Sequence, residues 1–131
     1  MITLTLANAQ EFFEVALADQ GVPVYFSNRL GEDYGRYQDN GVIYINSNLE
    51  GNDEEVLKTT VHETVHHLQL TKGIWIGEQS PNYWNPAITE DQSKLIEEIV
   101  KSSYPKSEWC MEIPAWSLQY DPMTVYEALI A

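Results

Sequence analysis

The sequence predicts an α+β fold, in which a small, mostly antiparallel sheet packs against a helical half. Short runs that alternate apolar and polar residues, with one helical segment among them, lie before residue 47. From residue 53 onward the apolar residues recur at helical spacing. Strands followed by helices are typical of the α+β class. The 131 residues, of which 44% are hydrophobic, are enough for one domain spanning residues 1–131.

In the first part of the chain the pattern predicts three strands, one helix and a tight turn. Residues 2–6 and 22–27 read as strands, and the stretch from Asn8 or Ala9 to Asp19 as an amphipathic helix between them. Asp39-Asn40-Gly41 is typical of a tight turn between two β-rich runs. The run after this turn, Val42 to Asn46, is expected to be an exposed edge strand that could pair with an extended peptide, although an internal strand fits its alternation equally well.

In the second part we expect four helices and one loop. Asn52 or Asp53 can cap a helix that runs to Lys72 and stops at Gly73. Residues 73–87 are rich in Gly, Pro and Asn and read as a loop. A helix capped by Thr89 should run to about Ser103 with four apolar residues inward: Leu95, Ile96, Ile99 and Val100. A helix around residue 112 and a short terminal helix begun by Asp121-Pro122 complete the chain.

The helix from Asp53 carries the pattern H-E-x-x-H, which points to metal chemistry. His62 and His66 are one helical turn apart, a spacing that suits two imidazoles binding one zinc ion. Glu63 can then act as general base toward a water molecule. Both histidines fall opposite the apolar stripe of the same helix, so we expect one face in the core and the other in a cleft: Leu57, Val61, Val65 and Leu68.

A catalytic zinc usually has three protein ligands, and the third one here should be a carboxylate. Glu112 is the favoured candidate because it lies at the edge of an apolar helical stripe, where an unpaired carboxylate is costly. The alternatives are Glu108, Glu97 and Glu98. The remaining histidine, His67, is about 100° round the helix from His66 and is expected to be a solvated or supporting residue.

HETVHH followed by the later E-x-x-A element of residues 112–115 resembles the small gluzincin-type zinc metallopeptidases, above all the compact ImmA/IrrE-like and phage-borne forms. The resemblance implies that His62, His66 and Glu112 bind zinc and that Glu63 is the catalytic base. It also implies a hairpin over residues 35–46. The sequence departs from the pattern of this family in two features: Pro114 and the long interval between His66 and Glu112. Pro114 should either bend its helix or lie in the first turn of a helix that begins near Met111.

These features predict zinc-dependent hydrolysis of a protein or peptide substrate. Glu63 would take a proton from water and pass it to the leaving amine. A donor should also stabilise the developing oxyanion, and four side chains are open candidates: Tyr104, Tyr83, Tyr120 and His67.

Composition restricts the class of partner and the compartment. A net charge of −13 repels nucleic acid and anionic membranes, and no apolar run is long enough to span a bilayer. The start of the chain does not read as a signal peptide, and a single cysteine, Cys110, suits a reducing compartment. We therefore expect a cytoplasmic protein (in the host cytoplasm if phage-encoded).

The pattern does not determine its oligomeric state. The alternative function is an acidic, non-enzymatic inhibitor or DNA mimic with a structural or vestigial metal site.

Overall fold

The computed structural model describes residues 3–38 and 41–131, and it confirms the α+β class. Six α-helices, three strands and two short 3-10 turns make up this part of the chain. They are α1 (Leu6–Asp19), β1 (Val24–Ser27), β2 (Gly35–Gln38), β3 (Val42–Asn46), a 3-10 turn (Ser47–Leu49), α2 (Asp53–Lys72), α3 (Pro81–Trp84), α4 (Glu90–Ser103), a 3-10 turn (Lys106–Glu108), α5 (Trp109–Leu118) and α6 (Pro122–Ile130).

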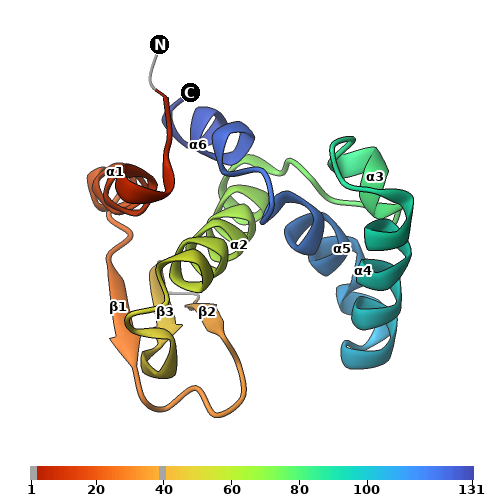
Figure 1. Ribbon diagram of the computed structural model, residues 1–131, viewed down its shortest axis with the longest axis horizontal. Coiled ribbons are helices and arrows are strands. Elements are labelled where there is room, and N and C mark those ends of the chain that lie inside the picture. Colours follow the sequence, from red (N-terminus) through yellow and green to blue (C-terminus); the bar gives the residue numbers. More distant parts are fainter. Residues whose placement is uncertain (1–2, 39–40) are drawn as a thin grey trace.

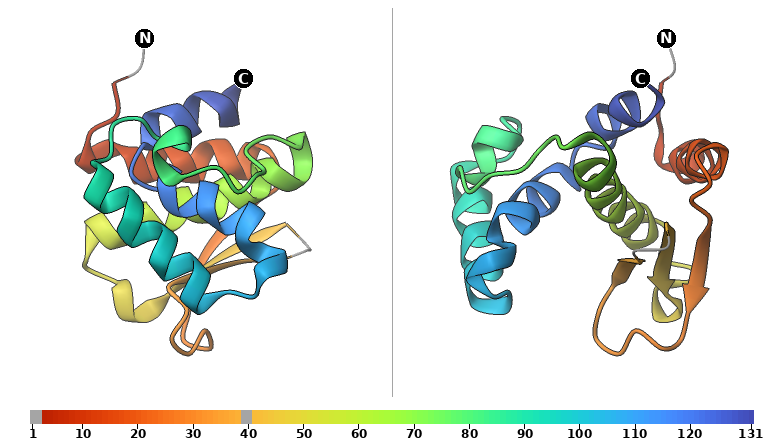
Figure 2. Two further views of the ribbon diagram at one scale, coloured as in Figure 1. Left: turned by 90° about the vertical axis from the view of Figure 1, so that its right-hand side faces the viewer. Right: turned by 180° about the vertical axis from the view of Figure 1, so that it is seen from behind.

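Helix α2 lies at the centre of the molecule (Figure 1). The sheet and α1 are on one side of α2, and α3, α4 and α5 are on the other, as the view from behind also shows (Figure 2, right). The bounds of α2 are those predicted, because both ends carry strong local signals. The Asn52 side chain accepts a hydrogen bond from the Glu55 backbone N–H (3.3 Å). Gly73 ends the helix in a left-handed conformation with φ of 64°.

The sheet is mixed, and not mostly antiparallel as expected, and it has the strand order β1-β3-β2. β1 pairs with β3 in parallel, and β2 pairs with β3 antiparallel. The expectation that Val42–Asn46 is an exposed edge strand is therefore wrong, because β3 has a neighbour on each side. β2 is instead the edge strand that contacts α2. The predicted tight turn falls largely on residues 39 and 40, which lie outside the described residues.

The predicted strand over residues 2–6 is also wrong for its described part. Residues 3–5 belong to no strand, and α1 begins at Leu6. The local polar groups explain this. The Thr5 backbone N–H donates to the Asn8 side chain (2.8 Å), and the Thr5 carbonyl accepts from the Ala9 N–H (2.8 Å). Thr5 thus serves as an N-cap, and the helix begins earlier than the expected Asn8 or Ala9.

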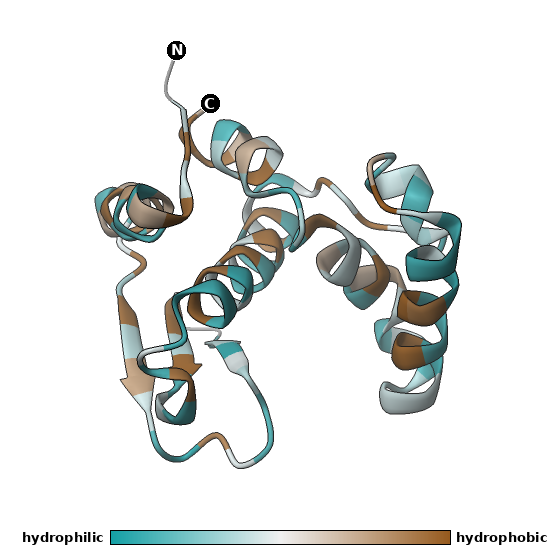
Figure 3. Cartoon of the chain, in the orientation of Figure 1, coloured by the Kyte–Doolittle hydropathy of each residue, from teal (hydrophilic) through white to brown (hydrophobic). Residues whose placement is uncertain are grey.

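The main core lies between α2 and the elements on its apolar side. Val61, Val65 and Leu68 of α2 are fully buried against α1, the sheet, α5 and α6. A second, smaller cluster joins α4 to α5: Ile88, Ile96, Val100 and Ile113. Helix α4 spans the predicted range, and Thr89 caps it. Figure 3 shows hydrophilic and hydrophobic segments alternating along α1 and α4, the helices at either flank.

Two expectations about the second half need correction. Leu95 was expected to face inward but is 56% exposed, because α4 turns only a narrow stripe toward α5. The predicted loop of residues 73–87 contains the short helix α3, and Pro81 occupies the first position of this helix. None of the helices formed by the described residues has the length and apolar character needed to cross a membrane.

Candidate metal centre

The two motif histidines lie side by side on the face of α2 that points away from the core. The centroids of the His62 and His66 rings are 5.0 Å apart. Their side chains are 11% and 15% exposed. Val61 and Val65, each one residue earlier in the chain and about 100° round the helix, are fully buried in the core. Burial of these apolar side chains therefore sets the angle at which both imidazoles are presented.

Helix α5 brings Glu112 to these histidines. One Glu112 carboxylate oxygen, Oε1, lies 3.0 Å from His62 Nε2, and the other, Oε2, lies 3.1 Å from His66 Nε2. One ligand atom from each of the three residues can be chosen so that all lie within 4.8 Å of one another, so this group could hold a metal ion. Ala115 is fully buried on α5, where its small side chain permits close contact with α2.

The other proposed carboxylate ligands do not join this group. Glu97 forms an ion pair with Lys101 (2.8 Å) on the outer face of α4. Glu98 and Glu108 are exposed to solvent. Among the residues that the structure describes, His62, His66 and Glu112 form the one cluster with metal-ligand geometry.

Pro114 is accommodated inside α5, in its second turn. The helix begins at Trp109, so the alternative of a start near Met111 does not hold. Because proline has no N–H, the carbonyl of Cys110 loses its usual partner four residues on. The Gly77 backbone N–H takes this place and donates to the Cys110 carbonyl (2.9 Å). The loop after α2 thereby holds the first turn of α5.

Two buried glutamines complete the site, and neither was among the residues predicted from the sequence. Gln119 Oε1 lies 2.7 Å from His62 Nδ1, and Gln69 Oε1 lies 2.7 Å from His66 Nδ1. A carboxamide oxygen can only accept, so each imidazole donates through Nδ1 and directs Nε2 to Glu112. For Gln69 a signal was present in the sequence, since a residue three positions after His66 lies on the same helical face.

Electrostatics couple the carboxylate to the histidines. Burial acts to raise the pKa of Glu112, but hydrogen bonds from His62 and His66 outweigh it and lower this pKa to about 2. For His66, burial acts to lower the pKa, but the hydrogen bond to Glu112 and the charges of Glu63 and Glu112 outweigh it and raise this pKa to about 9. Without a metal, His66 is therefore an imidazolium ion paired with a carboxylate at neutral pH.

Glu63 is buried beside this group, with a residue exposure of 6%. Burial raises the pKa of its carboxyl group, while the charges of His62 and His66 oppose the rise. The Tyr37 backbone donates a hydrogen bond to the same carboxylate, so the edge strand β2 orients it. Gly35 leaves room for it, because a Cβ there would lie 3.3 Å from Glu63 Cγ and would collide with the Thr59 side chain.

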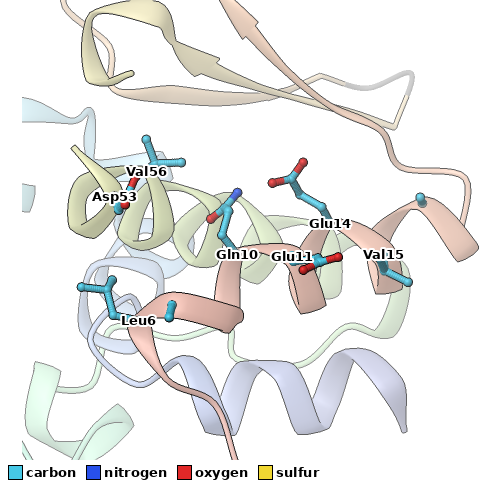
Figure 4. Close-up of a pocket in the computed structure, with 9 residues that line it drawn as sticks. Leu6, Gln10, Glu11, Glu14, Val15, Asp53 and Val56 are labelled. Carbon is cyan, nitrogen blue, oxygen red and sulfur yellow. The ribbon is translucent and has the colours of Figure 1, made fainter. Parts of the chain in front are cut away.

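A cleft of about 630 Å³ opens onto His62 and Glu63. Its walls come from β2 and the preceding loop, α2, α4 and α5. Besides these two residues, the lining comprises Glu32, Asp33, Tyr34, Gly35, Glu55, Lys58, Thr59, Ile99, Ser103, Tyr104, Trp116, Gln119 and Tyr120. A separate groove between α1 and the start of α2 is lined by Leu6, Gln10, Glu14 and neighbouring residues, and it includes no histidine (Figure 4).

Of the four candidates for stabilising an oxyanion, two line the cleft. Tyr104 and Tyr120 do so, whereas Tyr83 is 63% exposed elsewhere. His67 is buried away from the metal ligands, with Nδ1 3.1 Å from the Tyr37 hydroxyl and Nε2 3.0 Å from Gln20 Oε1. Burial raises the pKa of Tyr104 to about 12, so its hydroxyl keeps its proton.

Comparison of the chain with protein-family models, with curated proteins and with solved structures gave no match.

Proposed function

We propose that the protein is a zinc-dependent peptidase of the gluzincin type. One observation carries the proposal: two imidazole nitrogens of a single helix and a carboxylate from a distant helix converge beside a second, buried carboxylate, and a cleft opens onto His62 of this group and onto that second carboxylate, Glu63. Such a pairing of a His₂Glu ligand set with an adjacent general base suits hydrolysis of an amide bond.

The residues fit a zinc ion. With metal–ligand bonds of about 2.0–2.2 Å, adjacent ligand atoms in a tetrahedral site lie about 3.4 Å apart. The distances from Glu112 oxygens to the two Nε2 atoms, 3.0 and 3.1 Å, are close to this value. Three protein ligands leave one coordination position open. When bound, zinc would polarise the scissile carbonyl and lower the pKa of a water molecule toward 7.

Glu63 would be the general base. Its raised pKa suits a group that first takes a proton from water and then gives it to the leaving amine. The hydrogen bond from the Tyr37 backbone and the space left by Gly35 keep the carboxylate in one position. Tyr104 would donate a hydrogen bond from its hydroxyl to the developing oxyanion, because it lines the cleft and remains protonated.

An extended peptide is the substrate form that suits the cleft. Hydrogen bonds alternate along an antiparallel strand pair, and the Asn46 N–H donates to the Tyr34 carbonyl. The backbone groups of Gly35, the next residue, therefore point away from β3. Gly35 also lines the cleft. A peptide that adds to this edge of β2 would lie beside Glu63.

The test is a Glu63→Gln variant, with exposed Glu54→Gln on the same helix as the matched control. The proposal predicts that Glu63→Gln retains stoichiometric zinc and loses peptide cleavage, measured on a fluorogenic peptide library. Glu54→Gln should cleave normally. The acidic-inhibitor alternative, supported by the net charge of −13, would gain if Glu63→Gln kept the full biological effect of the protein.

A further inference from the structure

The geometry points to Gln69 as the positioning residue of the metal centre: one carboxamide fixes the His66 imidazole and holds the helix that bears Glu112. Gln69 is 2% exposed and lies on the His66 face of α2. Its side chain makes three hydrogen bonds. Oε1 lies 2.7 Å from His66 Nδ1, and Nε2 donates to the carbonyls of Trp75 (2.8 Å) and Met111 (2.9 Å).

These bonds leave a single orientation for the amide. Both N–H groups of Nε2 are directed to backbone carbonyls, which only accept, so Oε1 must face His66. The oxygen in turn requires a proton on His66 Nδ1. Nε2 of His66 is then the nitrogen directed at Glu112 and at the metal position. Gln69 thereby selects which ring nitrogen is available as a ligand.

The second role of Gln69 concerns the carboxylate ligand. Met111, whose carbonyl accepts from Gln69, directly precedes Glu112 in the first turn of α5. The Gly77 N–H bonds the neighbouring Cys110 carbonyl, which Pro114 leaves without a helical partner. Between these two contacts the chain turns through Trp75, which has a positive φ of 58°. Such a backbone is costly for a bulky residue, and here it directs the Trp75 carbonyl to Gln69.

Only a primary amide of this length satisfies all three partners. Glutamate could accept from His66, but its carboxylate would face two carbonyl oxygens with no proton to donate. Methionine has a similar shape and helix propensity but makes none of the three bonds. Gln10 offers a matched control, because it is a glutamine of α1 whose Nε2 donates across a helix contact to Thr60 Oγ1 (2.9 Å), away from the metal ligands.

The experiment compares Gln69→Met with Gln10→Met in zinc affinity, measured by competition with a chromophoric chelator. We expect Gln69→Met to bind zinc about 10- to 100-fold more weakly than the wild type and Gln10→Met to match the wild type. Equal affinity in wild type and Gln69→Met would overturn the inference. Thermal unfolding of both metal-free variants shows whether each is folded.

A second measurement uses ¹⁵N NMR of the histidine side chains and does not depend on a variant. In the zinc-loaded wild type we expect His66 to be metallated at Nε2 and to keep a slowly exchanging Nδ1–H. Metallation at Nδ1 would contradict the inference.

The inference rests on the proposed metal site, and the same spectra separate the two ideas. If the wild type binds no zinc, the metal-free protein still tests the role of Gln69. A slowly exchanging His66 Nδ1–H in the wild type, lost in Gln69→Met, would support that role. An Nδ1–H that exchanges as fast as that of an exposed histidine would refute it.

Discussion

Removal of the Glu112 charge should destabilise the metal-free protein in a way that depends on pH. Glu112→Gln abolishes the ion pair with His66, whose pKa of about 9 lies above the ordinary value of 6.5. A folded-state pKa that is raised contributes stability that is fully present below pH 6.5 and lost as pH rises through about 9. At 1.36 kcal/mol for each pKa unit, the whole shift of the His66 pKa, to which the charge of Glu63 and the hydrogen bond to Gln69 also add, corresponds to about 3 kcal/mol near pH 5.5, about 2 near pH 7.5 and close to zero near pH 10.

The lowered pKa of Glu112 includes this same interaction together with the hydrogen bond from His62, so the two contributions are not added. A lowered folded-state pKa contributes stability that is present above pH 4.5 and lost as pH falls toward about 2. The pair should therefore stabilise the protein most between about pH 4.5 and pH 6.5.

The assay is urea unfolding of the metal-free wild type and Glu112→Gln near pH 5.5, 7.5 and 10. The difference in the free energy of unfolding should shrink steadily as pH rises. Glu97→Gln is the matched control, because its ion pair with Lys101 is about two-fifths exposed on each side and should contribute at most about 0.5 kcal/mol. A difference between wild type and Glu112→Gln that is small, or that does not change with pH, would show that the His66–Glu112 ion pair does not stabilise the metal-free protein.

Three further predictions concern the metal and the cleft. Zinc binding must displace the Nε2 proton of His66, so zinc affinity should rise about tenfold per pH unit from about pH 6.5 to pH 9. Competition with a chelator measures this affinity, and an affinity that does not change with pH would contradict the ion pair. Gly35→Ala should lower kcat/KM on peptide substrates at least about tenfold while zinc stoichiometry stays unchanged, because the added Cβ meets Thr59 and Glu63. Normal turnover in this variant would exclude the close approach of β2 to α2. Tyr104→Phe should lower kcat about 10²- to 10³-fold with little change in KM if its hydroxyl stabilises the oxyanion, and an unchanged kcat would assign that role elsewhere.

Local signals in the sequence account for the helices that form the centre. Asn52 and Gly73 mark the ends of α2 in the sequence as they do in the structure, and Thr89 does the same for the start of α4. The angle between the histidines and the apolar stripe of α2 also follows from the 3.6-residue helical period. These features depend on residues within one or two turns of each other, which is why a single sequence contains them.

Features that depend on distant partners were not predictable in the same way. The alternation of residues 42–46 is the same for an edge strand and a central one, and only the parallel pairing with β1 makes β3 central. Pro114 suggested a bend or a later helix start, because nothing in the sequence reveals that Gly77 can bond the Cys110 carbonyl. At the N-terminus the error was local, since the capping interaction of Thr5 with Asn8 was read as part of a strand.

The third metal ligand was predictable in part from the sequence. The position of Glu112 on an apolar ridge favoured it over Glu97, Glu98 and Glu108, but its approach to the histidines depends on how α5 packs on α2. Gln69 and the loop after α2 contribute to that packing.

The most direct test of a zinc centre built by His62, His66 and Glu112 is X-ray absorption spectroscopy of the zinc-loaded protein, together with the metal stoichiometry. We expect one zinc per chain, bound by two imidazole nitrogens, one carboxylate and one exchangeable solvent oxygen. We also expect the carboxylate contribution to disappear in Glu112→Ala. A protein that binds no zinc, or one whose zinc has four protein ligands and no solvent oxygen, would contradict it.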